Sequence, residues 1–359
     1  MKFTQLNELQ MPTWRWLNMN ATELDAEADF DTPYTGGVLS ADESEVHIAH
    51  HVDLHAIENL PEDVARMREF VFKNQNYALT VTIPKGLQVA QPVLLEFVLD
   101  DTSPMLIDFL HIKAEAGSRA DVIVRYLSSG DGAYFHSGFA HVQADAKSQV
   151  RLIKLQTLGK RDTHIDTTAV SVGVGARGDA LFCELGGGRI ASGCNISLAG
   201  TESRGALDAL YFGTGERIQD FNYRMELRGT GAEGEIVAKG VLTGKAKKTL
   251  KSTLDFIAGA LGAKGSEEET VLALSDRAVN LSAPLLLSGE ANVEGSHATS
   301  GGKPDPGKLY YLMSRGFTEA EAKRLLVEAS FTPILNKLPL QELRGTVYDR
   351  IQEVVHDES

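Results

Sequence analysis

The chain has 359 residues, of which 43% are hydrophobic and 23% are charged, which is typical of a globular protein with room for two or three domains. Its net charge of −14 repels phosphate backbones, and no run reaches the roughly 20 apolar residues of a membrane span, which argues against nucleic-acid binding and membrane insertion. The first residues lack a cationic segment followed by an apolar run, so we expect no secretory signal and a cytoplasmic location.

The first ninety residues mix several kinds of element. Met11–Trp16 predicts an ordered element whose two tryptophans pack on the protein, and residues 20–45 are acidic and turn-rich, which predicts a surface loop. Pro61 opens a predicted helix that runs to Phe72, because proline is tolerated in the first helical turn. Apolar residues at three-to-four spacing give this helix one buried face: Val64, Met67, Phe70 and Val71.

From about Ala78 the pattern changes to short strands separated by turns of small residues. Seven turns of related composition recur at intervals of 25 to 33 residues, and they begin at Gly117, Asp145, Gly175, Gly200, Gly229, Gly262 and Glu290. A loose period of this size indicates stacked coils, each burying its apolar face against its neighbours. Because no helical pattern interrupts the strands, alternating βαβ units are excluded. A β-helix and a sandwich remain, and the spacing favours a parallel β-helix.

The end of the chain predicts three short helices. The first begins at Asp305-Pro306 and stops at Gly316, and the second begins at a capping box formed by Thr318 and Glu321. The second helix ends near Pro333 and has apolar residues on one face: Ala322, Leu325, Leu326 and Ala329. The third spans Leu340 to Val355. Helices this short must cover the solenoid, bind a partner, or do both.

Two glycine motifs resemble nucleotide-binding loops but lack the required context. Gly173–Gly178 matches G-x-G-x-x-G, yet a predicted strand follows it rather than the helix whose amides would hold a pyrophosphate. Gly240–Lys245 has the wrong spacing for a phosphate loop and is followed by Ala246, where Ser or Thr would contact magnesium. We therefore expect no ATPase site in this chain.

Histidine and cysteine offer further candidates for chemistry. His47, His51 and His55 would share one face of a helix, with His50 nearby, and imidazoles four residues apart can chelate a metal. Exposed histidine clusters also bind metals adventitiously. Cys183, in an alternating strand, is expected to be a buried apolar side chain, whereas Cys194 beside Gly193 could be exposed and accept sulfur. Two cysteines predict no disulfide framework and a reducing compartment.

Five segments occur in the order found in one known family. They are Ile83-Pro-Lys-Gly, Ala238-Lys-Gly-Val-Leu-Thr-Gly-Lys-Ala, Leu285-Leu-Leu-Ser, Ser296-His-Ala-Thr and Tyr311-Leu-Met-Ser-Arg-Gly. Together they resemble the SufB/SufD family of scaffold proteins for iron–sulfur cluster assembly, over about residues 76–338, and SufD more than SufB. The resemblance implies a right-handed parallel β-helix at 78–303, between an amino-terminal α/β region at 1–77 and a carboxy-terminal helical domain at 304–359.

The resemblance also implies a function without catalysis. The chain would be a scaffold subunit bound to a SufC-type ABC ATPase and paired edge to edge with a SufB-type paralogue or a second copy of itself. Its carboxy-terminal helices would bind the ATPase through Tyr310, Leu312, Arg315, Glu321, Leu325, Leu326 and Glu328. No cofactor would be tightly bound, although a transient iron–sulfur cluster would form at the subunit interface.

The candidates for cluster assembly are His297, Glu294 and Cys194. His297 matches the histidine that SufD-type members place at the junction, and a neutral imidazole is a suitable iron ligand. Without the resemblance, His297 would be read as a structural histidine that caps a turn. Two departures are clear: Gly295 stands where many SufD-like sequences have cysteine, and residues 267–273 lack the cysteine of SufB-type members. Two thiols are also too few for a [4Fe–4S] cluster. We therefore assign sulfur acceptance to a partner.

Two other function classes compete with the scaffold. A β-helix enzyme acting on carbohydrate would need converging carboxylates and aromatic residues for stacking, but the acids lie mostly in turns and aromatics make up only 7% of the chain. An adaptor unrelated to clusters would require the five motifs to coincide by chance.

Overall fold

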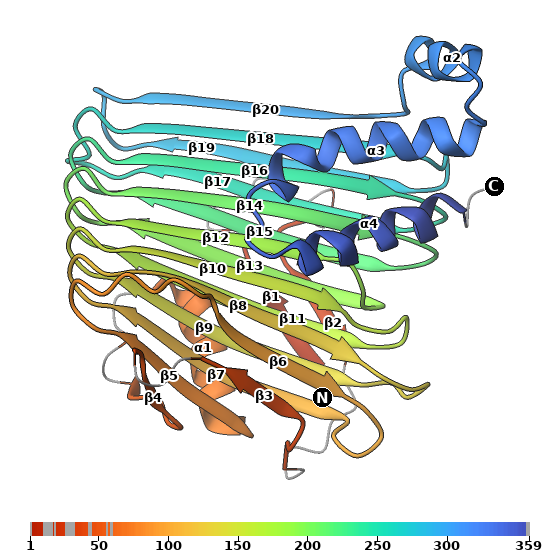
Figure 1. Cartoon of the computed structure of the whole chain (residues 1–359). Helices are drawn as coiled ribbons and strands as arrows, with labels where there is room; N and C mark the ends of the chain where they lie inside the picture. Colours follow the sequence, from red (N-terminus) through yellow and green to blue (C-terminus); the bar gives the residue numbers. More distant parts are fainter. Residues whose placement is uncertain are drawn as a thin grey trace.

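The computed structural model describes residues 2–9, 17, 19–25, 33–41, 45–54, 57 and 60–356. Two nine-stranded sheets face each other and share one long core (Figure 1). The chain alternates between them, so each coil contributes one strand to each sheet, and consecutive strands of a sheet pair in parallel from β5 and β6 onward. The prediction of a parallel β-helix is confirmed.

From β7 onward every strand of the solenoid has eight to ten residues, whereas the strands before it are shorter. The first sheet contains β4 (His47–Ala49), β5 (Tyr77–Ile83), β7 (Met105–Ala114), β9 (Phe135–Ala144), β11 (Thr163–Val172), β13 (Arg189–Leu198), β15 (Ile218–Leu227), β17 (Lys247–Phe256) and β19 (Val279–Ser288). The second contains β3 (Gly37–Ser40), β6 (Val93–Leu99), β8 (Arg119–Ser128), β10 (Gln149–Thr157), β12 (Arg177–Glu184), β14 (Arg204–Gly213), β16 (Glu233–Leu242), β18 (Lys264–Ala273) and β20 (Glu294–Gly302). β3 and β4 pair antiparallel with β6 and β5 and close the amino-terminal end.

A column of glycines lets the two sheets approach closely along one side of the core. In the second sheet, the second residue of each of the last five strands, β12 to β20, is glycine: Gly178, Gly205, Gly234, Gly265 and Gly295. Each would direct a Cβ atom into the opposite sheet; at Gly234 it would lie 2.2 Å from the sulfur of Met225. A side chain does not fit at such a close approach, which is why glycine occurs inside these strands.

The amino-terminal region covers the outer face of the first sheet. Helix α1 (Glu62–Asn74) and the hairpin β1 (Lys2–Leu6)–β2 (Thr22–Asp25) pack over it through a second apolar cluster. Asn7 fixes the hairpin to the solenoid, since its amide donates to a carboxylate oxygen and to the carbonyl of Asp220, both at 2.9 Å. Gly193 lies beneath Asn7, and any Cβ there would stand 2.9 Å from the Asn7 side-chain oxygen.

The structure confirms the helix after Pro61 and corrects two other predictions for this region. Residues 20–45 were expected to be a surface loop, but they contain β2 and β3, because pairing with distant strands stabilises segments of little local preference. His47 belongs to strand β4 rather than to a helix. The element predicted at Met11–Trp16 and the position of His55 lie outside the described residues.

Three carboxy-terminal helices follow the solenoid, and two of them cover the outer face of the second sheet (Figure 1). They are α2 (Pro306–Ser314), α3 (Glu319–Leu335) and α4 (Gln341–His356). The predicted capping box of Thr318 and Glu321 is present, and α3 ends near Pro333 as predicted, at Leu335. None of the described helices is both long and apolar enough to cross a bilayer.

Candidate functional site

The carboxy-terminal end of the solenoid is open. β19 and β20 are the last strands of their sheets, so each has one edge without a strand partner among the described residues. Every described side chain of β20 is exposed. An unprotected pair of strand edges is a template for pairing with another chain. The edge strands at this end therefore present unpaired backbone hydrogen-bonding groups.

His297 lies at this open end. It is in register with Glu267 of the neighbouring strand β18, and Glu267 points into the solenoid and is buried. His297 therefore continues the inward-facing column, yet it is exposed because no further coil covers it. One Glu267 oxygen accepts from the Ser252 hydroxyl at 2.9 Å, and the other is buried with no hydrogen-bond partner in the part of the chain that the structure describes. The Glu267 carboxylate and the His297 imidazole thus stand on neighbouring strands at this open end, which we call the mouth of the solenoid, and both groups are ligand types that suit divalent iron.

A second polar group lies just inside the mouth. Lys248 and Glu269 form a fully buried ion pair, and Tyr211 donates to the same Glu269 oxygen at 2.8 Å. The other Glu269 oxygen has no hydrogen-bond partner among the described residues. Burial raises the pKa of Glu267 and lowers the pKa of Lys248. The apolar core therefore gives way to charged groups near the open end.

The other two cluster-assembly candidates do not join His297. Glu294 begins β20 on the outside, where it forms an exposed ion pair with Lys264 at 3.1 Å. Cys194, whose exposure the sequence left undecided, is buried in the core between the sheets, three strands of its sheet before the edge strand β19. Burial raises the pKa of the Cys194 thiol, and that of Cys183 under the carboxy-terminal helices, which disfavours the reactive thiolate. The chain thus brings no thiol to the mouth.

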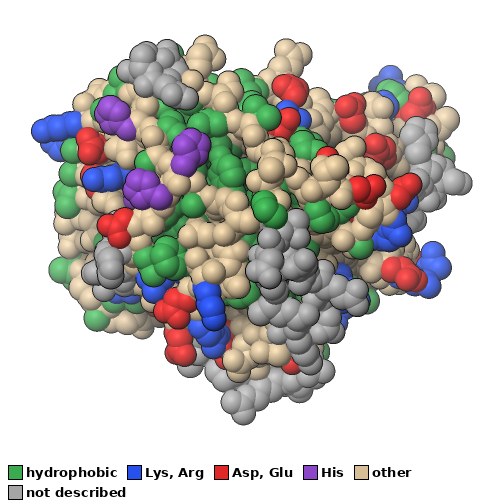
Figure 2. Space-filling view, turned by 90° about the horizontal axis from the view of Figure 1, so that it is seen from below, with side chains coloured by type: hydrophobic (Ala, Val, Ile, Leu, Met, Phe, Trp, Pro, Cys, Tyr) green, Lys and Arg blue, Asp and Glu red, His purple; other side chains and the backbone are tan. Residues whose placement is uncertain are grey.

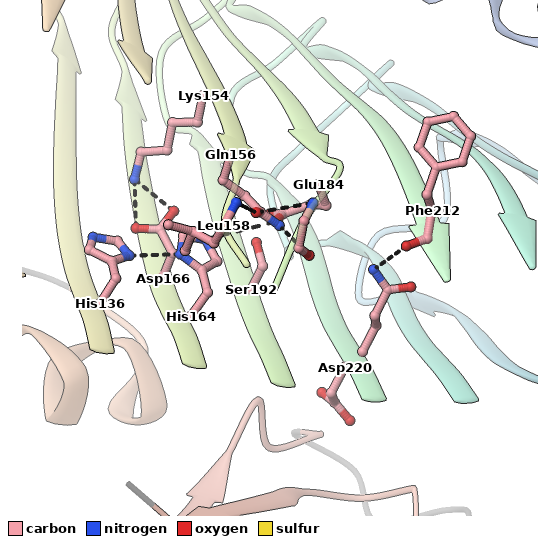
Figure 3. A network of polar contacts seen from close by, with 12 residues as sticks. His136, Lys154, Gln156, Leu158, His164, Asp166, Glu184, Ser192, Phe212 and Asp220 are labelled. Atoms are coloured by element: carbon pink, nitrogen blue, oxygen red, sulfur yellow. Dashed lines mark hydrogen bonds and ion pairs between the residues drawn. The ribbon is translucent and has the colours of Figure 1, made fainter. Parts of the chain in front are cut away.

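The sequence reasoning missed a buried polar network in the amino-terminal half of the core (Figure 3). His136 contacts Asp108 at 2.5 Å through one ring nitrogen and His164 at 2.7 Å through the other. Beside them the Lys154 ammonium donates to both oxygens of Asp166 at 2.8 Å. The sequence does carry a sign of this network: in these strands, polar residues stand at inward-facing positions that apolar residues otherwise fill.

Burial shifts the pKa of these groups toward their neutral forms. It raises the pKa of Asp108 to about 6 and lowers the pKa of His136 to about 3 and of His164 to about 4. A second buried pair, His111 and His141 on the outer side of the same sheet, contacts through ring nitrogens at 3.1 Å. Burial also lowers the pKa of His141 to about 3, and the adjacent His111 acts in the same direction.

Acid should therefore weaken the fold, and His141 offers a clear measurement of the effect. Because its native pKa lies below the ordinary 6.5, the unfolded chain binds a proton that the native state excludes, and stability falls as the pH drops below about 6.5. Between pH 7 and pH 4, the free energy of unfolding should fall in both proteins. We expect the fall to be about 1–3 kcal/mol smaller in His141→Gln than in the wild type. Equilibrium denaturation at several pH values measures this difference. The exposed His50→Gln variant is the control, and equal losses in all three proteins would contradict the prediction.

The histidines weighed above as possible metal ligands do not share one helix face, because His47 lies in strand β4, and His55 lies outside the described residues. His47, His50 and His51 are exposed near the closed end, and Figure 2 shows histidine side chains gathered on this face. Over the described ranges, however, no group of three His, Cys, Asp or Glu residues is arranged to hold a metal ion. Glu267 and His297 at the mouth likewise have no third described ligand beside them. A metal ion bound there therefore needs ligands from another molecule.

The predicted partner-binding residues fall into an exposed and a half-buried group. Tyr310 and Arg315 are exposed on and just after α2, a helix with no buried residue, and Leu312 is half-buried between them. On α3, Leu325, Leu326 and Glu328 are half-buried, while Glu321 belongs to the capping box. Helix α3 packs on the solenoid through residues that are not among these predicted contacts: Val327, Phe331, Ile334 and Leu335. The exposed surface is thus concentrated on α2.

Comparison with known proteins agrees with this geometry. Residues 97–330 match the family model for the SUF system FeS cluster assembly, SufBD core domain. The chain is similar to the iron–sulfur cluster assembly protein SufD of Bacillus subtilis, with 30% identity over 76% of this chain and 63% of the relative. SufBD family proteins of Mycobacterium tuberculosis and Pyrococcus horikoshii are 23% and 26% identical over 78% and 74% of this chain, and 71% and 59% of their own lengths. The chain thus spans less than two thirds of the Bacillus and Pyrococcus relatives.

Proposed function

Because this chain belongs to the SufBD family of iron–sulfur cluster assembly proteins, we propose that it is a non-catalytic scaffold on which a nascent cluster is held while a partner supplies the thiolates. The observation that carries this proposal is the open mouth, where His297 stands in register with the buried Glu267. Iron and sulfide are the cargo of this site. Its donor set is incomplete, because both cysteines are buried elsewhere in the fold.

The missing ligands would come from a second subunit at the same end. Since β19 and β20 end their sheets together, another solenoid that docks here extends both sheets at once. A SufB-type paralogue with a cysteine near its own edge would complete the site. A second copy of this chain would supply another His297 and Glu267 but no exposed thiol, and it would need sulfur from elsewhere.

A SufC-type ABC ATPase is the second proposed partner, and the carboxy-terminal helices are its docking surface. Tyr310, Tyr311 and Met313 of α2 and Phe317 after it are large apolar side chains that remain exposed. Exposed apolar groups clustered in this way mark protein-binding surfaces. Nucleotide binding by the ATPase would then act on the mouth through α3, provided that the two nucleotide states bind the helices with different affinity.

Replacing His297 by alanine should lower cluster yield without affecting assembly of the complex. The imidazole is exposed, so its removal should leave the fold intact and delete a ligand. We expect iron and sulfide per complex to fall at least fivefold after anaerobic co-expression with the ATPase and the paralogue. Metal analysis and the cluster absorbance of the purified complex measure this.

The matched control is Ser296→Ala, which removes a neighbouring exposed side chain of the same strand and should keep the wild-type iron content. Unchanged iron in the His297 variant would contradict a ligand role. If the complex itself failed to form, His297 would belong to the docking contact instead.

Native mass spectrometry of the co-expressed proteins tests the pairing. One copy of this chain with one paralogue and two ATPase subunits would support the mixed scaffold. A homodimer that recruits the ATPase without the paralogue would support the self-paired form. A monomer that binds neither protein would overturn the proposed function.

A further inference from the structure

One edge of the solenoid is basic, although the chain as a whole carries a net charge of −14. The edge consists of five turns that lead from the second sheet to the first, at residues 158–163, 185–189, 214–218, 243–247 and 274–279. In Figure 1 these turns lie on the side where β20 passes into α2. Six cations are exposed on them, against the exposed acids Glu216 and Asp276: Lys160, Arg161, Arg189, Lys245, Lys247 and Arg277.

Most of this positive charge is not neutralised by other described residues. Glu216 pairs with Lys245 at 2.9 Å, and Asp276 pairs with Lys303 at 2.7 Å. Arg161, Arg189 and Arg277, like Lys160, form no ion pair with any described residue. The nearby acid Asp162 is buried, and its carboxylate accepts from backbone amides of the turns instead. The exposed cations are therefore available to an external anionic group.

The basic edge is hollowed by two adjoining grooves of about 520 and 710 Å³, which share Lys160, Gly188 and Glu216 in their walls. The turns in their walls stack backbone on backbone. A Cβ at Gly188 would lie 2.1 Å from the carbonyl oxygen of Lys160, and one at Gly244 would lie 2.8 Å from the carbonyl oxygen of Gly215. Glycine at these turns therefore permits this close stacking.

Apolar side chains alternate with the cations. Arg189, Ile218, Lys247 and Val279 are the first residues of four successive strands and lie in register. Ile218 is 41% exposed and Val279 is 42% exposed. Since neighbouring strands are about 4.8 Å apart, cation and apolar group alternate at that spacing. We propose that the basic edge binds an acidic protein segment that carries apolar side chains.

Charge and shape favour a protein over a nucleic acid as the occupant. A phosphate backbone offers no apolar side chain for Ile218 and Val279, and it would be repelled by Glu216. It would also meet the exposed Asp101 and Asp131 on the next turns toward the closed end. A segment with acidic and apolar residues complements both features, and opposite charge would speed its association.

The test uses the full chain and a fluorescein-labelled synthetic peptide of sixteen residues in which aspartate or glutamate alternates with leucine. Fluorescence anisotropy gives its affinity for the wild type, for Arg161→Glu/Arg189→Glu/Arg277→Glu, and for a control triple variant. The control is Lys85→Glu/Arg119→Glu/Lys147→Glu, which reverses three exposed charges on the opposite edge. We expect the first variant to bind at least tenfold more weakly than the wild type and the control to lose less than twofold.

Two further probes decide the chemistry. A peptide with serine in place of leucine should bind at least fivefold more weakly, because it lacks the apolar anchors. A single-stranded oligonucleotide of matched charge should bind more weakly than the leucine peptide. Equal binding of the oligonucleotide, or equal losses in the two triple variants, would overturn the proposal. Normal thermal unfolding of both variants would establish that any loss is local.

Discussion

Replacing Lys248 by methionine should lower the free energy of unfolding by about 3–5 kcal/mol, because it leaves the carboxylate of Glu269 buried without a counter-charge. Both side chains are completely inaccessible to solvent. Lys248 also donates to the Leu281 carbonyl at 3.2 Å and to the Ser282 hydroxyl at 3.0 Å. It therefore ties the edge strand β19 to the coil before it.

Equilibrium denaturation measures the loss, and hydrogen exchange of β19 and β20 locates it. The double variant Lys248→Met/Glu269→Gln is the matched comparison, because glutamine is neutral and its side-chain oxygen still accepts a hydrogen bond from the Tyr211 hydroxyl. It should recover at least half of the lost stability. If the double variant is as unstable as the single one, the loss arises from packing rather than from the isolated charge.

Placing two aspartates on α2, at Tyr310 and Met313, should weaken binding of a SufC-type ATPase at least 100-fold. Tyr310 is 76% exposed and Met313 is 45% exposed, so neither contributes to the folded core. Aromatic anchors at protein interfaces typically contribute 2 kcal/mol or more each, and about 2.8 kcal/mol corresponds to the 100-fold change. Isothermal titration calorimetry with the purified ATPase measures it.

The control is Val174→Asp, which puts the same charge on an apolar side chain that is 55% exposed in a turn of the solenoid. Binding should survive this change. If the α2 variant binds as tightly as the wild type, the docking surface lies elsewhere on the chain. If both variants lose affinity, added negative charge is responsible rather than a lost contact.

Local patterns in the sequence predicted the architecture well. Recurring turns and short strands indicated a parallel β-helix, and the capping box of Thr318 and Glu321 correctly marked the start of α3. These features are local, because a turn or a cap is formed by residues that are neighbours in the chain. The resemblance to SufB/SufD sequences added the family, which the comparisons support.

The surroundings of particular side chains could not be predicted in the same way. The sequence did not decide whether Cys194, beside Gly193, is exposed, and the structure places it in the core. Both faces of most strands are covered, the inner face by the opposite sheet and the outer face by α1 or by α3 and α4. Alternation shows which residues share a face, but it does not show what covers that face.

The sequence by itself determined the solenoid, the terminal helices and the presence of His297 after the last turn. Only the tertiary structure decided that Glu267 lies beside His297, that Asp108, His136 and His164 meet in the core, and that cations from separate turns form one edge. Residues roughly thirty apart in the chain become neighbours at the spacing of adjacent strands, about 4.8 Å. That proximity depends on the register of the coils, which is set by the packing of the whole core rather than by any one coil.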